Sequence, residues 1–391
     1  MPVKPITSLD LKNKKVLVRC DFNVPIQDGK IQDTGRIDAS LDTIRHILQH
    51  GGSAVICSHL GRPKERSAEL SLKPIAEYLS TALAQKIVLA PDCIGDHTGK
   101  MVDALKPGEA LLLENLRFHR EEEANDRDFS HELARHKQVY VNDAFGTAHR
   151  AHASTVGVTK FLAERAAGFL MMRELDALRA VTENPEHPAI AILGGAKVSD
   201  KIGVIKNLIT KVDSILIGGA MAYTFLKAKG IPVGRSRVED DKVELARELL
   251  ALADSKQVKI LLPSDHIVSA EPEATTSIYT VNDIPSAMMA LDIGPRTVES
   301  FIAEIARAKT VIWNGPLGFF EIPAFAEGTM KVGEALANQT GVKSIIGGGD
   351  TASAIAHAPW ANKFTHISTG GGATLEYLEG RELPGVKALG S

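Results

Sequence analysis

The sequence of 391 residues contains few cysteines and no long apolar run. Its three cysteines, Cys20, Cys57 and Cys93, are an odd number without a Cys-x-x-Cys spacing, which argues against a disulfide framework and favours reduced thiols. No apolar run approaches the ~20 residues that cross a bilayer, and the N-terminal residues lack the apolar segment of a secretion signal. We therefore expect a cytoplasmic protein without a membrane partner.

An excess of basic residues is also missing, because 45 Lys and Arg residues are opposed by 48 Asp and Glu residues, a formal net charge of −3. Proteins that bind nucleic acid usually carry a basic excess, so we do not expect nucleic acid as a partner. The 44% of hydrophobic residues can build large cores. The length favours two or three domains of roughly 100–200 residues each.

Short apolar runs recur along the whole chain, and amphipathic stretches separate many of them. Each run suits a strand that is buried on both faces of a parallel sheet. One amphipathic stretch has Ile37, Leu41, Ile44 and Leu48 on one helical face, with Asp38 as a candidate N-cap. The predicted strands are Val16–Val18, Ala54–Cys57, Ile87–Leu89, Ala110–Leu113, Val139–Val141, Ala189–Leu193, Ser214–Ile217, Lys259–Leu262, Thr310–Trp313 and Ser344–Ile346. Because so many strands exceed one core, we predict an α/β fold with two doubly wound, Rossmann-like parallel-sheet domains.

A helix, rather than a flexible linker, is expected to join the two domains. Met171, Leu175, Leu178 and either Val181 or Thr182 have the spacing of one helical face, and Asn184-Pro185 ends the pattern. We expect a cleft between the domains and hinge bending at the ends of this helix.

Polar side chains follow four of the predicted strands in the first half, at the sheet edge where open α/β sheets bind ligands. Arginine dominates this set, and its planar guanidinium suits carboxylate and phosphate. Each arginine alone could be a surface or ion-paired residue, but several at one edge indicate a small ligand with several negative charges. The loops are Arg19–Pro25, Ser58–Lys64, Glu114–Phe118 and Asn142–His152, joined by Arg36. His59, His149 and His152 could add donors, although a lone histidine is more often structural.

Glycine-rich turns follow the strands of the second half. Bare glycines let backbone N–H groups approach an anion, and a helix N-terminus behind them favours negative charge. In the most informative turn, Gly347–Thr351, Asp350 could hold the Mg²⁺ that accompanies a phosphate, or it could serve only as an N-cap. The other turns are Gly194–Lys201, Ile217–Met221, Trp313–Glu321 and Ser368–Thr374.

Two lysines, Lys197 and Lys201, lie four residues apart in a segment that differs from a Walker A loop. We expect them in the first turns of a helix, on one face, where a bound phosphate would offset their unfavourable interaction with the helix dipole. Two solvated lysines are the alternative. Glu321 could accept hydrogen bonds from ribose hydroxyls. A glycine-rich half that faces an arginine-rich half indicates a kinase.

The ordered set of motifs resembles the phosphoglycerate kinase family over essentially the whole chain. The resemblance rests on Asp21–Pro25, Ser58–Lys64, Glu114–Phe118, Asn142–Thr155, Gly194–Lys201, Trp313–Gly318, Gly347–Thr351 and Ser368–Thr374. It implies a bilobed, monomeric enzyme of glycolysis that reversibly forms ATP and 3-phosphoglycerate from 1,3-bisphosphoglycerate and ADP, with Mg²⁺. It also implies domains at residues 1–170 and 171–373, with 374–391 returning to the first domain.

The resemblance further implies which residues form the site. Phosphoglycerate would contact Asp21, Phe22, Asn23, Arg36, His59, Leu60, Gly61, Arg62, Arg117 and Arg150. Nucleotide would contact Gly195, Lys197, Lys201, Gly219, Asn314, Glu321, Gly347, Gly348, Gly349, Asp350 and Thr351, with Asp350 on the metal. Cys20 and Asp42 depart from residues that are frequent in the family, but neither belongs to this set.

The mechanism expected is in-line phosphoryl transfer, in which positioning and charge stabilisation do most of the work. Both nucleophiles are already ionised near neutral pH, so no general base is needed. Arg36 and Lys197 are the candidates to hold the transferring group from opposite sides, once both ligands have closed the site and excluded water.

Two other functions fit parts of the pattern. A dinucleotide-dependent dehydrogenase would need Gly-x-Gly-x-x-Gly after a strand, with an acid ~20 residues later, and no clear case occurs. A two-domain solute-binding protein would normally carry an export signal and would not need a metal site like that of Asp350.

Overall fold

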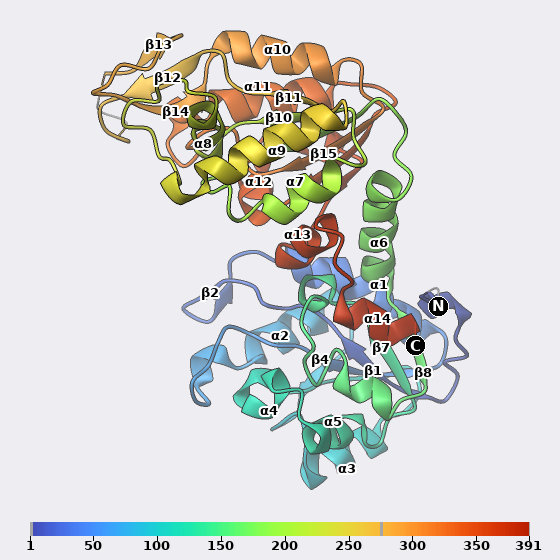
Figure 1. Ribbon diagram of the computed structural model, residues 1–391. Coiled ribbons are helices and arrows are strands. Elements are labelled where there is room, and N and C mark those ends of the chain that lie inside the picture. Colours follow the sequence, from blue (N-terminus) through green and yellow to red (C-terminus); the bar gives the residue numbers. More distant parts are fainter. Residues whose placement is uncertain (1–2, 274–276, 391) are drawn as a thin grey trace. The chain divides into compact units, whose positions relative to one another are not determined.

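The structure, a computed structural model, describes residues 3–273 and 277–390, so residues 1–2, 274–276 and 391 of the expected domain ranges lie outside the described part. The chain divides into two compact units. The first comprises Met1–Leu175 and Glu382–Ser391, and the second comprises Asp176–Arg381. Both ends of the chain belong to the first unit (Figure 1).

The first unit is built on a six-stranded parallel sheet with the order β5-β6-β4-β1-β7-β8. β1 can lie at the centre because its middle residues, Val16–Val18, are apolar and fully buried, so both faces of the strand are covered. The strands are β1 (Lys15–Arg19), β4 (Ser53–Cys57), β5 (Val88–Leu89), β6 (Ala110–Leu112), β7 (Val139–Asn142) and β8 (Glu164–Ala167). The helices are α1 (Gly35–Gln49), α2 (Lys73–Ala82), α3 (Asp96–Ala104), α4 (Arg120–Glu123), α5 (Arg127–Ala134) and α14 (Pro384–Gly390).

The second unit repeats this plan with the parallel order β11-β10-β9-β15-β16-β17. Its core contains the two tryptophans, Trp313 and Trp360, together with Phe301. The strands are β9 (Ala189–Leu193), β10 (Ser214–Ile217), β11 (Lys259–Leu261), β15 (Thr310–Asn314), β16 (Lys343–Gly347) and β17 (His366–Ile367). The helices are α7 (Ile202–Leu208), α8 (Met221–Ala228), α9 (Val243–Ser255), α10 (Pro295–Ile305), α11 (Glu327–Ala337), α12 (Gly349–Ile355) and α13 (Gly372–Leu378).

Two small antiparallel elements were not expected from the sequence. A three-stranded sheet with the order β13-β12-β14 consists of β12 (His266–Ser269), β13 (Tyr279–Val281) and β14 (Met289–Ile293), and it packs on its own apolar cluster. A short hairpin pairs β2 (Ile26–Gln27) with β3 (Lys30–Ile31). The first of these sheets adds a wall to the site of the second unit.

Helix α6 (Phe169–Thr182) carries the chain from the first unit into the second. Its predicted apolar face is confirmed, because Met171, Leu175, Leu178 and Val181 are fully buried. The predicted pair of parallel sheets is confirmed as well. Asp38 was wrongly expected to be an N-cap: α1 begins at Gly35, and the Asp38 carboxylate inside the helix accepts a hydrogen bond from the Thr34 hydroxyl at 2.7 Å.

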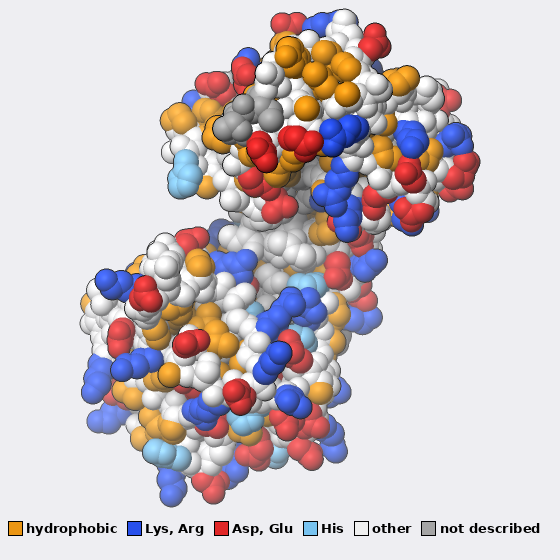
Figure 2. Space-filling view, turned by 90° about the vertical axis from the view of Figure 1, so that its left-hand side faces the viewer, with side chains coloured by type: hydrophobic (Ala, Val, Ile, Leu, Met, Phe, Trp, Pro, Cys, Tyr) orange, Lys and Arg blue, Asp and Glu red, His pale blue; other side chains and the backbone are white. Residues whose placement is uncertain are grey.

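The surface has a mixed character. On the face shown in Figure 2, Lys and Arg side chains are interspersed with Asp and Glu over most of the surface. Within the described ranges, none of the helices has the length and apolarity to cross a membrane. Cys20, Cys57 and Cys93 are free and buried.

Candidate active site

In the first unit, the loops after β1, β4, β6 and β7 meet at the carboxyl edge of one sheet, because these strands are parallel neighbours. Backbone and side-chain hydrogen bonds tie the loops together. The Phe22 N–H donates to the Ser58 hydroxyl at 2.9 Å, and the Gly61 N–H donates to Asn23 Oδ1 at 2.8 Å. The predicted clustering of these loops is therefore present in the structure.

Asp21 and Arg36 form an ion pair at this edge. The Arg36 Nη1 atom lies 3.1 Å from Asp21 Oδ2, and the Arg36 side chain keeps 40% of its exposure. The other carboxylate oxygen accepts from the Asn23 N–H at 3.2 Å. Asp21 thus orients Arg36 and Asn23 while the rest of the guanidinium stays open to a ligand.

Arg117 is held by the backbone of a neighbouring loop and by a carboxylate. Its Nη1 donates to the Gly61 carbonyl at 2.8 Å, while its Nε lies 3.1 Å from Glu123 Oε1 without the alignment of a hydrogen bond. Asn115 fixes the same loop, because its side chain both accepts from the Leu60 N–H and donates to the Leu60 carbonyl. The Arg117 guanidinium is therefore positioned by backbone geometry.

Phe22 and Leu60 are buried, and their N–H groups are used within the loops. Both side chains belong to the apolar core of the first unit. Arg62 and Arg150, in contrast, are exposed. His149 is half-buried and His152 is buried.

Arg19, which begins the predicted loop Arg19–Pro25 but was not among the expected ligand contacts, is a buried cation. Its Nε donates to the Ser154 hydroxyl at 2.8 Å, and its Nη2 lies 3.2 Å from His59 Nδ1. Ser154 in turn bonds the fully buried Glu122 through both its N–H and its hydroxyl. Because arginine has no acceptor, His59 Nδ1 must accept, and the neutral ring carries its proton on Nε2.

The electrostatic potential of this cluster is positive. Burial, followed by the charges of Arg19, Arg117 and Arg36, lowers the pKa of His59 well below its usual value. Burial, followed by the charges of Arg117, Arg19 and Arg150, lowers the pKa of His152 to about 4. Both histidines are therefore neutral at pH 7, and the positive potential comes from the arginines.

In the second unit, the loops after β9, β10 and β15 lie against one another with almost no space for side chains. The Gly195 N–H donates to the Pro316 carbonyl, and the Met221 N–H donates to the Gly195 carbonyl. A Cβ atom on Gly194 would lie 2.0 Å from the Pro316 carbonyl oxygen. The glycines at these turns are thus required by close backbone contact.

A cavity of about 380 Å³ opens beside these loops. Predicted residues line it, namely Gly195, Gly219, Glu321 and Asp350. Leu317 and Phe319, from the predicted turn Trp313–Glu321, line it as well. The rest of the wall was not predicted, because part of it comes from the antiparallel sheet. Those residues include Tyr223, Arg237, Met289, Leu291 and Asp292.

The lysines do not lie in a helix, so that expectation was wrong: α7 begins at Ile202, after both of them. Lys197 is exposed, whereas Lys201 is half-buried and donates a short hydrogen bond to Asn314 Oδ1. Burial lowers the pKa of Lys201 to about 8, against the opposing effects of Asp200 and Asp350. The two lysines therefore have different surroundings.

The turn Gly347–Thr351 lies next to Asn314. The Thr351 hydroxyl accepts from the Gly315 N–H at 2.7 Å and donates to the Gly347 carbonyl at 3.1 Å. Asn314 Nδ2 is buried and has no hydrogen-bond partner, and Asp350 is exposed at the cavity. An exposed carboxylate suits Mg²⁺, and an unpaired amide donor suits a phosphate oxygen, so these residues fit a metal-bound nucleotide.

Comparison with known proteins decides the family. The phosphoglycerate kinase family model matches residues 6–381. The chain belongs to the phosphoglycerate kinase family. A curated phosphoglycerate kinase from Anaeromyxobacter dehalogenans (strain 2CP-C) is 54% identical over 99% of both chains, and one from Clostridium novyi (strain NT) is 51% identical over 99% of this chain and 98% of that protein.

Solved structures agree with this membership. The phosphoglycerate kinase of Coxiella burnetii superposes with a TM-score of 0.93 at 39% identity, covering 100% of this chain and 99% of the other. That of Pyrococcus horikoshii OT3 gives 0.82 at 33% identity, over 99% and 98%. Phosphoglycerate kinases are phosphotransferases, so the predicted family, fold class, enzyme class and reaction are confirmed.

Proposed function

We propose that this chain transfers a phosphoryl group reversibly from 1,3-bisphosphoglycerate to Mg-ADP, giving 3-phosphoglycerate and ATP in glycolysis. The observation that supports the assignment best is the arginine cluster of the first unit, whose charges act with burial to keep His59 neutral. A cluster of positive charge of this kind favours a negatively charged ligand. A phosphorylated carboxylic acid carries negative charge at both of its ends.

The phosphoglycerate site would use the loops of the first unit. Arg36 and Arg117 are positioned by Asp21 and by the Gly61 carbonyl, respectively, so both guanidinium groups are preorganised for an anion. His59, with its proton on Nε2, would donate a further hydrogen bond. Arg62 and Arg150 are exposed, and we assign them to the outer part of the same site. The backbone of the loop at Phe22, Leu60 and Gly61 would shape the site.

The nucleotide site would use the cavity of the second unit and the turns beside it. Its apolar lining suits a purine base, Glu321 would accept from the ribose, and Lys201 with the Asn314 amide would face phosphate oxygens. Asp350 would hold Mg²⁺, with the Gly347–Thr351 turn around it. When bound, the metal would neutralise charge on the phosphates.

Positioning and charge, rather than proton transfer, would carry the reaction. The attacking oxygen is a phosphate of ADP, or a carboxylate in reverse, and either is ionised without a base. We assign Arg36 and Lys197 to the transferring phosphoryl group. Because the two residues belong to different units, both ligands must bind before both side chains can act, and we propose that the units close only in that ternary complex.

We keep as predictions a first domain of residues 1–170 with 374–391 and a second domain of residues 171–373. A cytoplasmic location and a monomeric state also stay predictions. The two compact units meet after Leu175 and after Arg381, a few residues from these limits. The difference arises because both units contain part of α6, and because α13 packs on α7 in the second unit.

The direct test is ATP formation when 1,3-bisphosphoglycerate and Mg-ADP are added together. We expect ATP to appear in step with 3-phosphoglycerate, and neither product when ADP or the acyl phosphate is omitted. Hydrolysis of 1,3-bisphosphoglycerate without ATP would reject the proposal, and so would dinucleotide-dependent chemistry without phosphoryl transfer.

A further inference from the structure

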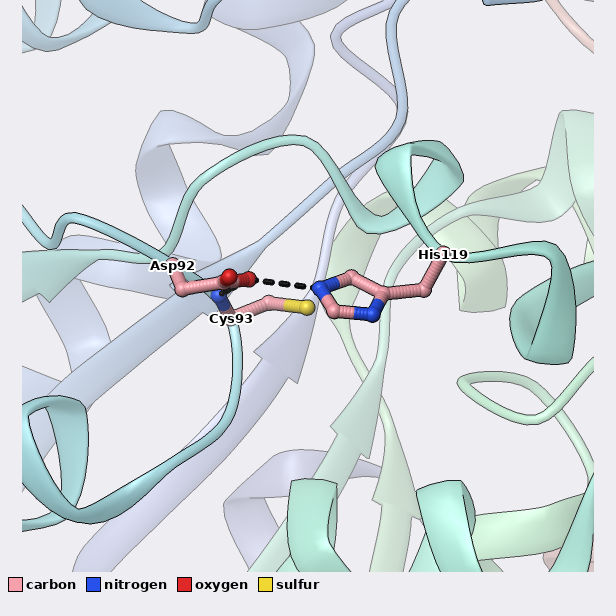
Figure 3. Close-up of side chains that lie close together, drawn as sticks. All are labelled: Asp92, Cys93 and His119. Atoms are coloured by element: carbon pink, nitrogen blue, oxygen red, sulfur yellow. Dashed lines mark hydrogen bonds and ion pairs between the residues drawn. The ribbon is translucent and has the colours of Figure 1, made fainter. Parts of the chain in front are cut away.

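Three side chains of types that bind metals lie close together in the first unit. None of the three belongs to the residues proposed for phosphoryl transfer. Asp92, Cys93 and His119 each offer one ligand atom, and these atoms all lie within 4.8 Å of one another. Figure 3 shows the Asp92 carboxylate and the Cys93 sulfur on the same side of the imidazole, both next to one ring nitrogen. The cluster joins the segment after β5 to the residue after the short helix Leu116–Phe118.

We propose that Asp92, Cys93 and His119 form a binding site for a borderline divalent transition-metal ion, of which Zn²⁺ fits best. Thiolate, imidazole and carboxylate are the donors that Zn²⁺ uses, whereas Mg²⁺ and Ca²⁺ prefer oxygen alone. Three protein ligands leave one position of a tetrahedral ion for water, as in sites with an open coordination position. On binding, the Cys93 thiol would lose its proton to solvent and become the sulfur ligand.

The distances need only small adjustments. His119 Nε2 and Asp92 Oδ1 are joined by a hydrogen bond of 2.7 Å. Two atoms that each lie about 2.1 Å from a tetrahedral ion are roughly 3.4 Å apart, so this pair must open by roughly 0.7 Å. Both side chains are partly exposed, at 25% for His119 and 31% for Asp92, so the ion has a path from solvent and the side chains have room to move.

The surroundings hold the ligands in place. The Asp92 carboxylate accepts from the Cys93 N–H at 2.6 Å, and the Asp92 carbonyl accepts from the Thr98 hydroxyl at 3.0 Å. The His119 ring packs on Phe129 with centroids 5.3 Å apart. Such contacts around a metal site fix ligand orientation. Cys93 is fully buried, so its sulfur faces the other two ligands rather than bulk water.

One neighbour opposes the ion. Arg66 Nη1 lies 3.3 Å from Asp92 Oδ2, and its Nη2 donates a short hydrogen bond to the Pro91 carbonyl. This cation repels a divalent ion and competes for the same carboxylate. Because half of the Arg66 side chain is exposed, it can turn into solvent when an ion binds. Removing its charge should therefore strengthen metal binding, an effect that a purely structural cluster would not predict.

The test is titration of the intact protein with ZnCl₂ and, separately, with CoCl₂. We expect Zn²⁺ to bind by calorimetry, and Co²⁺ to give the near-ultraviolet absorption of a cobalt–thiolate bond. Cys93→Ser should abolish that absorption, and His119→Gln should weaken Zn²⁺ binding by more than about tenfold, since even outer partners of metal sites contribute on that scale. Arg66→Gln should tighten it.

Three variants serve as controls. His131→Asn removes an exposed histidine, Cys57→Ser removes another buried thiol, and Asp350→Asn removes the candidate Mg²⁺ ligand. All three should bind Zn²⁺ as the wild type does. If Cys93→Ser does not fold, as judged by circular dichroism, the partly exposed His119 still tests the site. Absence of the cobalt–thiolate band, or Zn²⁺ affinity unchanged in His119→Gln, would overturn the proposal.

Discussion

A buried carboxylate in the second unit should make stability depend on pH. Asp292 in β14 is 1% exposed and lines the cavity. Its two oxygens accept from the Ile293 and Gly328 N–H groups, each at 2.8 Å. Burial raises the pKa of Asp292 to about 7 in spite of these hydrogen bonds. We predict that Asp292→Asn removes a pH dependence that the wild type shows.

The sign and size follow from proton linkage. Between the unfolded pKa of about 3.9 and the folded pKa of about 7, the folded state binds a proton that the unfolded state does not, so stability falls as pH rises. Each pH unit within the window costs about 1.4 kcal/mol. From pH 5.5 to 8.5, only the part below about 7 contributes, so the free energy of unfolding should fall by about 2 kcal/mol because of this group.

Urea unfolding, followed by tryptophan fluorescence, provides the assay, because Trp313 and Trp360 both lie in the core of the same unit. Asp292→Asn loses one of two acceptors, so we expect it to be less stable by about 1–3 kcal/mol at pH 5.5. That deficit should shrink by about 2 kcal/mol at pH 8.5.

The exposed Asp254 provides the matched control, and Asp254→Asn should follow the wild type at every pH. If the wild type and Asp292→Asn lose stability in parallel between pH 5.5 and 8.5, the carboxylate titrates normally and the reasoning is wrong.

Other parts of the account can be checked in the same way. Gly219→Ala should destabilise the second unit by roughly 1–3 kcal/mol and weaken nucleotide binding in calorimetry. The reason is that φ of Gly219 is +65° and the new Cβ would lie 2.6 Å from the Gly195 nitrogen. A nucleotide affinity equal to that of the wild type would contradict this close contact. Asp350→Asn should weaken Mg-nucleotide binding while phosphoglycerate affinity stays nearly intact, and a matching loss of both would contradict the division between units. Arg19→Lys should raise the KM for 3-phosphoglycerate and change the ¹⁵N shifts of the His59 ring, whereas unchanged shifts would show that Arg19 does not fix the tautomer.

The strands of both parallel sheets were predictable because their residues are apolar at successive positions. Each of the predicted runs overlaps a strand of the two large sheets. The edge strand β8 begins with Glu164 and Arg165, and β13 is largely exposed, so neither carries that signal. Their positions depend on pairing with neighbours, which periodicity does not report.

The site was predictable where it follows from chain order and was missed where it depends on tertiary contacts. Arginines and glycines in loops after parallel strands are visible in the sequence. The link from Arg19 to Glu122 is not visible, however, because Glu122 stands in a run of acids that is typical of a solvated surface. Only the fold buries both and connects them through Ser154. Asp292 similarly reaches the cavity from the antiparallel sheet.

The central claim is that positioned positive charge, rather than a general base, carries out phosphoryl transfer. The most direct measurement is the turnover of Arg36→Ala at saturating concentrations of both substrates, with stability measured alongside. The partly exposed pair with Asp21 should contribute only about 0–1 kcal/mol to stability, whereas an arginine on a transferring phosphoryl group is worth roughly 10³–10⁵ in rate. The account predicts a folded protein with turnover reduced by that range. A variant that keeps more than about a tenth of wild-type turnover would contradict it.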